Sequence, residues 1–220
     1  MQITDGLHAF CWESMTANNC NTYLIDGPAR ILIDPGHLHL FDHVERGLTD
    51  LGLGVGDIDL VLLTHCHPDH MEAVTRFAKT SALTALHQEE WRLIRQMDQY
   101  LAAFGVRPEA IAPDFFLKEG DLSVRGLTLQ VIHLPGHSPG SVAFFWPDRR
   151  ALFTGDVVFD GGVGRTDLPG GSGPALRESI ERVSEIRAEH VLPGHGPVIS
   201  GAASVHENFK WLTANMLSYI

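Results

Sequence analysis

Basic residues are scarce in this sequence. Its 220 residues include 16 Lys and Arg against 27 Asp and Glu, which gives a formal net charge of −11 at pH 7 with histidine neutral. A nucleic-acid-binding protein needs a basic surface to attract phosphate groups. We therefore do not expect nucleic acid to be a partner.

Cysteine and long apolar runs are scarce as well. The three cysteines, Cys11, Cys20 and Cys66, are odd in number and lack the spacing of a zinc finger, so we expect reduced thiols. No apolar run approaches the length of about 18 residues that predicts a membrane span. The first residues also lack the basic and apolar regions of a signal peptide. These absences predict a soluble, cytoplasmic protein without a membrane partner.

The apolar pattern predicts an α/β fold in one domain, residues 1–220. NTYLID and RILIDPG, separated by Gly27 and Pro28, predict a hairpin, and Ile58 to Leu63 predicts a buried strand. Turn residues between the short apolar runs of 115–156 predict antiparallel strands. Predicted helices cover 40–51, 71–77, 89–104, 175–186 and the chain from about residue 202. Strands and helices in both halves favour two packed sheets with helices outside.

Histidine is abundant, with 13 copies. The segment THCHPDH places His65, His67, Asp69 and His70 directly after the predicted strand 58–63. A single histidine in a loop is usually solvated or packed, but four imidazole and carboxylate groups this close together favour a metal site. Cys66 is expected to point away from these groups and to pack in the core.

Three further segments, LPGHSPGS (134–141), LFTGD (152–156) and VLPGHG (191–196), complete a resemblance to the metallo-β-lactamase superfamily. The resemblance implies a four-layer αββα sandwich and two divalent metal ions. It assigns one ion to His65, His67 and His137, and the other to Asp69, His70 and His195, with Asp156 as a bridge. These donors suit zinc first, and also iron or manganese.

Two such ions can lower the pKa of a shared water molecule, so a bridging hydroxide is the expected nucleophile. Asp69 is the expected catalytic residue, which would orient the hydroxide and pass a proton to the leaving group. Asp34, in the IDPG turn, either supports the metal-binding histidines or only caps its turn. Glu72 stands where the family usually has glycine; it would either add a carboxylate near the site or, as we interpret it, lie on a helix surface.

The loop GGVGRTDLPGG (161–171) resembles glyoxalase-II-like hydrolases and persulfide dioxygenases. It favours a hydrolase that cleaves a thioester or other ester-like small molecule. Arg165 would bind a substrate carboxylate, or pair with Asp167 to stabilise the loop. Only 25 residues follow His195, fewer than the helical domain with which glyoxalase II binds glutathione, so we leave glutathione recognition open.

Three other functions stay open at this point. A persulfide dioxygenase would need one iron ion, held by His65, His137 and Asp156. A lactonase would use the same nucleophile on a different leaving group. A non-catalytic protein would keep the metal for folding alone. Homo-oligomerisation is also open, because the last helix could pack on its own chain or meet a second copy.

Overall fold

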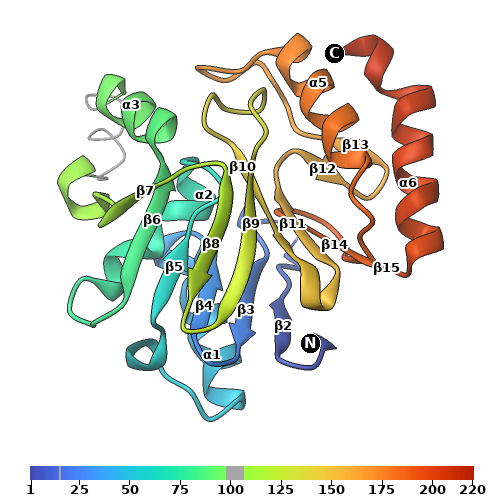
Figure 1. Cartoon of the computed structure of the whole chain (residues 1–220). Coiled ribbons are helices and arrows are strands. Elements are labelled where there is room, and N and C mark those ends of the chain that lie inside the picture. The colour runs from blue at the N-terminus through green and yellow to red at the C-terminus, as the bar shows by residue number, and fades with distance from the viewer. Residues whose placement is uncertain (15, 98–106) are drawn as a thin grey trace. The chain divides into compact units, whose positions relative to one another are not determined.

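The computed structural model describes residues 1–14, 16–97 and 107–220 (Figure 1). This part of the chain forms two compact units, Met1–Leu117 with Val124–Leu127, and Lys118–Ser123 with Thr128–Ile220. Each unit contains one large sheet and its own cluster of buried apolar side chains. The single domain expected for residues 1–220 stays a prediction.

The first unit has a seven-stranded sheet whose strands lie in sequence order. They are β1 (Gln2–Thr4), β2 (Leu7–Phe10), β3 (Thr22–Asp26), β4 (Arg30–Ile33), β5 (Leu60–Leu62), β6 (Leu83–His87) and β7 (Phe115–Leu117). β3 and β4 are antiparallel, with Asp26 opposite Arg30, which confirms the predicted hairpin. From β4 to β7, neighbouring strands are parallel.

The pairing of β7 corrects one expectation from the sequence. Phe115–Leu117 was expected among the antiparallel strands of the second half, but it pairs with β6 in parallel. A parallel neighbour requires a crossover connection with intervening structure, and α3 (Gln88–Gln96) and η4 (Pro108–Ile111) lie between these two strands. The remainder of the helix predicted over 89–104, from residue 98 on, lies outside the described residues.

The other helices of this unit are α1 (Asp42–Asp50), α2 (Pro68–Met71), η1 (Leu38–Leu40), η2 (Val55–Asp57) and η3 (Glu72–Phe77). The predicted helix over 71–77 is therefore a 3₁₀-helix that follows one α-helical turn. The N–H of Ala73 donates to the carbonyl of Gly36 at 2.9 Å, and the carbonyl of Asp69 accepts from the N–H of Cys20 at 3.3 Å. These outside partners replace the α-helical bond from Ala73 to Asp69, so the α-helix ends there.

The second unit has a six-stranded sheet in the order β15-β14-β11-β10-β9-β8. Its strands are β8 (Gly120–Val124), β9 (Leu127–His133), β10 (Val142–Trp146), β11 (Ala151–Gly155), β14 (His190–Pro193) and β15 (Ile199–Ser200). β9, β10 and β11 pair antiparallel, as predicted, whereas β11 and β14 are parallel. β12 (Val158–Phe159) and β13 (Gly162–Val163) form a small separate ribbon.

Two long helices, α5 (Gly173–Ser184) and α6 (Ala202–Asn215), lie side by side in this unit (Figure 1). Both were predicted, and η5 (Pro147–Arg149) and η6 (Leu217–Tyr219) are short additions. Phe209 and Leu212 of α6 are buried in one core cluster with Leu176 and Ile180 of α5, while Trp211 stays 45% exposed. The last helix thus packs on its own unit.

The described residues contain neither a membrane-spanning helix nor a disulfide bond. In this part of the chain, no helix combines the length and the apolar character needed to cross a membrane. The three cysteines all lie in it, and no disulfide joins any of them.

A close contact fixes the loop between β9 and β10. Gly136 has φ +139°, and a Cβ there would lie 2.2 Å from the backbone nitrogen of Leu176 in α5. The carbonyl of Gly136 accepts from the N–H of Ser172 at 2.8 Å, and the Ser179 hydroxyl donates to the carbonyl of Pro135 at 2.6 Å. The loop therefore rests directly on the first turns of α5.

We expect Gly136→Ala to lower the free energy of unfolding by about 3 kcal/mol more than Gly120→Ala, because a backbone contact cannot relax as a side chain can. Gly120 is a matched control, since its φ is +125° but its added Cβ would meet nothing within 4 Å. Urea denaturation of both variants measures the difference. Equal losses would show that backbone strain alone, and not the contact with α5, makes Gly136 necessary.

Candidate metal centre

In the first unit, two neighbouring parallel strands end at the same edge of the sheet. Ile33 of β4 lies opposite Leu62 of β5, so Asp34 and the segment from Thr64 to His65 leave the sheet side by side. The N–H of Asp34 continues the ladder by donating to the carbonyl of Leu62 at 3.0 Å. The carboxyl ends of parallel strands are where α/β proteins commonly place functional groups.

Asp34 is a buried carboxylate that organises this edge. Its Oδ1 accepts from the N–H of Thr64 at 2.8 Å, and its Oδ2 accepts from the Thr64 hydroxyl at 2.6 Å and from His70 Nδ1 at 2.9 Å. The single Thr64 hydroxyl proton is thus used, so this oxygen accepts from His65 Nδ1 at 3.0 Å. Both rings therefore carry their proton on Nδ1, and Nε2 keeps the lone pair that a metal ion needs.

The turn into α2 gathers the other groups of the cluster. His67 precedes the helix, and Pro68 at its first position begins it. The rings of His65 and His67 lie 4.8 Å apart between centroids, and those of His65 and His70 lie 4.1 Å apart. A metal-binding atom of Asp69 lies within 4.8 Å of one of His70. The structure thus brings together all four groups that the sequence places between 65 and 70.

One contact of this cluster has no signal in the sequence. Asp69 Oδ2 accepts from the side-chain amide of Asn18 at 2.6 Å, across 51 residues of chain. Asn18 belongs to no motif, and only the folded chain brings it to α2. It fixes one oxygen of the carboxylate that we expect to act in catalysis.

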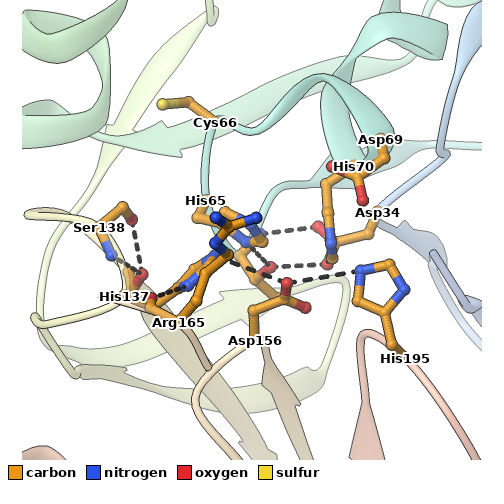
Figure 2. A network of polar contacts seen from close by, with 12 residues as sticks. Asp34, His65, Cys66, Asp69, His70, His137, Ser138, Asp156, Arg165 and His195 are labelled. Atoms are coloured by element: carbon orange, nitrogen blue, oxygen red, sulfur yellow. Dashed lines mark hydrogen bonds and ion pairs between the residues drawn. The ribbon is translucent and has the colours of Figure 1, made fainter. Parts of the chain in front are cut away.

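Cys66 faces the other way, as predicted from its place between two histidines (Figure 2). It packs in the core cluster of the first unit, and its N–H donates to Glu90 Oε2 at 2.7 Å. Burial, and then the nearby Glu90 carboxylate, raise the pKa of the Cys66 thiol well above its usual range. The thiol therefore stays protonated at neutral pH and is a poor metal ligand.

In the second unit, the same strand-end rule brings together Asp156 and His195. β11 and β14 are parallel, with Gly155 opposite Pro193, and the N–H of Gly194 donates to the carbonyl of Gly155 at 2.8 Å. The loop that carries His137 reaches this edge too. It joins β9 to β10, and β10 runs antiparallel to β11, so the start of β10 and the end of β11 lie at one edge.

Asp156 lies between the two histidines of this unit (Figure 2). Its Oδ2 is 3.5 Å from His137 Nε2 and 3.4 Å from His195 Nε2. His137 Nδ1 donates to the backbone carbonyl of Arg165 at 2.8 Å, so its Nε2 also keeps a lone pair. The hydrogen bond from His137 to Arg165 requires the backbone of Gly164 to pass close to Asp156. A Cβ at Gly164 would lie 1.8 Å from the carbonyl oxygen of Asp156.

The side chain of Arg165 is occupied within its own loop. Its Nε and one terminal nitrogen each contact a different carboxylate oxygen of Asp167 at 2.7 Å, and 62% of the Arg165 side chain is exposed. These hydrogen bonds lower the pKa of Asp167 to about 2. The backbone carbonyl, and not the guanidinium, is the part of Arg165 that reaches a predicted ligand, and sequence patterns do not indicate such a contact.

The interpretation of Glu72 as a helix-surface residue is wrong. Its Oε2 accepts from His37 Nδ1 at 2.8 Å and from the N–H of Leu38 at 3.4 Å, and only 16% of its side chain is exposed. The carboxylate turns back onto the loop after β4 because η3 begins beside Gly36.

Comparison with known proteins identifies the family. Residues 15–200 match the model of the Metallo-beta-lactamase superfamily, and the chain belongs to this superfamily. It is 35% identical to the probable metallo-hydrolase YqgX of Bacillus subtilis, over 84% of this chain and 90% of the relative. It is 34% identical to the hydroxyacylglutathione hydrolase GloC of Haemophilus influenzae, over 74% of this chain and 76% of that enzyme.

Among solved structures, TTHA1623 in a di-iron-bound form is 36% identical, with a TM-score of 0.71, and the match covers 86% of this chain and 93% of that one. The predicted α/β fold of the metallo-β-lactamase type is thus confirmed, as is the resemblance to the glyoxalase-II-like branch. The chain is a metal-dependent hydrolase of this superfamily.

We expect Asp34→Asn to weaken zinc binding by about 10–100-fold, the usual effect of losing a partner of a metal-binding histidine. An amide has one acceptor oxygen, so it cannot accept from the Thr64 N–H, the Thr64 hydroxyl and His70 as the carboxylate does. Asparagine tolerates the φ of +52° at this position, so the backbone is preserved.

Competition with a chromophoric zinc chelator measures the change in affinity. The matched control is Asp26→Asn, which changes a carboxylate that is 36% exposed and pairs with Arg30. The control should bind zinc as the wild type does. Unchanged affinity in Asp34→Asn would show that Asp34 does not orient metal ligands.

Proposed function

We propose that this hydrolase cleaves a thioester, or a similar ester of a small molecule, with two divalent metal ions. The position of Asp156 carries the proposal. One oxygen of this carboxylate is about equally far from His137 Nε2, at 3.5 Å, and from His195 Nε2, at 3.4 Å. Two ligands of one tetrahedral zinc ion lie about 3.3 Å apart, for metal–ligand distances of about 2 Å. This oxygen can therefore share one ion with each histidine.

We assign the ligands as the family resemblance implies. His65, His67 and His137 would hold one ion, Asp69, His70 and His195 the other, and Asp156 both. Neutral imidazole and carboxylate donors fit zinc, iron or manganese, and the hydrogen bonds that His65, His70 and His137 donate from Nδ1 place the metal-binding lone pair on Nε2. Zinc is our first choice, because it suits a site built mainly of histidine.

When bound, two such ions would provide a nucleophile from water at neutral pH and stabilise the negative charge that develops on the substrate oxygen. The residues of the chain do the rest. Asp34 and Thr64 hold the rings of His70 and His65, and Asn18 holds Asp69 through one of its oxygens. Asp69 then has a fixed direction from which to orient the attacking water and to pass a proton to the leaving thiolate.

The GloC relative supports a thioester substrate. It is a hydroxyacylglutathione hydrolase, and the two sequences are 34% identical over 169 residues. A thiolate is a better leaving group than an alkoxide, so a thioester places the smaller demand on the proton donor. The cytoplasmic location expected from the sequence agrees with such a substrate and stays a prediction.

We expect His67→Ala to lose most of its bound metal and to hydrolyse S-lactoylglutathione more than about 100-fold more slowly. This variant removes a proposed metal ligand itself, whereas Asp34→Asn removes only a hydrogen-bond partner of a ligand. Elemental analysis and a thioester-cleavage assay check this. His206→Ala, an exposed histidine of α6, is the matched control and should keep both properties.

Wild-type metal content and turnover in His67→Ala would refute the site. An oxygen-electrode assay of the wild type on glutathione persulfide tests the mononuclear alternative. One iron ion per chain with persulfide-dependent oxygen uptake would make the protein a dioxygenase.

We further propose that Arg165 stabilises its loop and does not bind substrate charge, because Asp167 already contacts its guanidinium. Arg165→Ala should raise KM by less than about 3-fold, and equally for anionic and neutral thioesters, since a solvent-exposed ion pair contributes little to the stability of its loop. Asp167→Asn should have the same small effect on KM, and again equally for both kinds of thioester. A KM that rises tenfold for the anionic thioester alone would instead place Arg165 on the substrate.

A further inference from the structure

A second group of metal-binding side chains lies in the first unit. His37 precedes η1, His39 lies within it, and Glu72 begins η3. One ligand atom from each residue lies within 4.8 Å of those of the other two. The group shares no residue with the ligands assigned above, and the proposed reaction gives it no task.

Two of the three side chains are already held in place. His37 Nδ1 donates to Glu72 Oε2 at 2.8 Å, and only 18% of the His37 side chain is exposed. The backbone on both sides is tied as well. The N–H of His37 donates to the Asn19 side chain at 2.8 Å, and the N–H of Ala73 donates to the carbonyl of Gly36 at 2.9 Å. A ligand at this pair would therefore cost little ordering of the chain.

His39 completes the group from the solvent side. Its ring centroid lies 5.0 Å from that of His37 at an interplanar angle of 45°, and the residue is exposed. Ligands of one tetrahedral zinc ion lie about 3.3 Å apart. Closing the group to this spacing needs a rotation of the exposed His39 side chain and a small separation of His37 from Glu72.

We propose that His37, His39 and Glu72 form an additional site for a divalent transition-metal ion, with zinc, nickel and copper as the ions it suits. Two imidazoles and one carboxylate are borderline donors of the kind these ions prefer, and calcium or magnesium would require more oxygen ligands. In the metal-free chain a proton lies between His37 Nδ1 and Glu72 Oε2. The ion would take the place of this proton, and water would fill its open positions.

The test is a calorimetric titration of the purified, metal-loaded protein with ZnCl₂ after desalting. The wild type should bind one further zinc ion per chain with a micromolar Kd. His39→Ala should weaken this binding at least tenfold and leave thioester hydrolysis unchanged, because His39 is exposed and outside the proposed catalytic ligands. Glu72→Gln should also weaken it, whereas His206→Ala, an exposed histidine of α6, should bind zinc as the wild type does.

One variant separates this proposal from the proposed function. His67→Ala should lose the metal assigned to catalysis and still bind the further zinc ion. No further zinc in the wild type, or full affinity in His39→Ala, would overturn the additional site and leave the His37–Glu72 hydrogen bond as a structural tie. Failure of the catalytic assays would leave these titrations interpretable, because they measure zinc and not turnover.

Discussion

Parallel strands that end at one edge of a sheet determine where the functional groups of this chain lie. β4 and β5 end together in the first unit, and β11 and β14 end together in the second. In each pair the next residues carry the polar side chains, so groups far apart in sequence meet without a long ordered loop. The strands themselves are buried in the core, so these polar side chains lie in the loops just beyond the strand ends.

Each unit also fixes the tautomer of some of its histidines through groups that are not metal ligands. In the first unit the buried carboxylate of Asp34 orders His70 directly and His65 through Thr64. In the second, a backbone carbonyl at Arg165 orders His137. A neutral imidazole has one donor and one acceptor nitrogen, so a fixed partner at Nδ1 decides which nitrogen can bind a metal. The motif provides the ligands, and these partners decide which atoms they present.

The sequence predicts the features that depend on neighbours along the chain. The hairpin of β3 and β4, the helices α5 and α6 and the clustering of His65 to His70 all follow from local pattern and spacing. The missed features are contacts between distant segments. Asn18 reaches Asp69 across 51 residues, and β7 joins β6 through a crossover. Glu72 was misinterpreted for the same reason, because its partner lies 35 residues earlier in a loop that carries no helical or strand pattern.

Asp34 shows how a residue can serve a site at a cost to folding. It adopts φ +52°, a left-handed conformation that is strained for residues other than glycine, and the residue is 2% exposed. Burying a carboxylate costs several kcal/mol unless hydrogen bonds offset the lost water. Three donors do so here, of which one is His70 Nδ1 and another is the Thr64 hydroxyl, which in turn contacts His65. An apolar residue here would leave the Thr64 N–H, the Thr64 hydroxyl and His70 Nδ1 buried without this acceptor, and His70 would lose the partner that fixes its tautomer. The contacts of Asp34 therefore serve two ends, because they satisfy the buried donors of Thr64 and orient the rings of His70 and, through Thr64, His65.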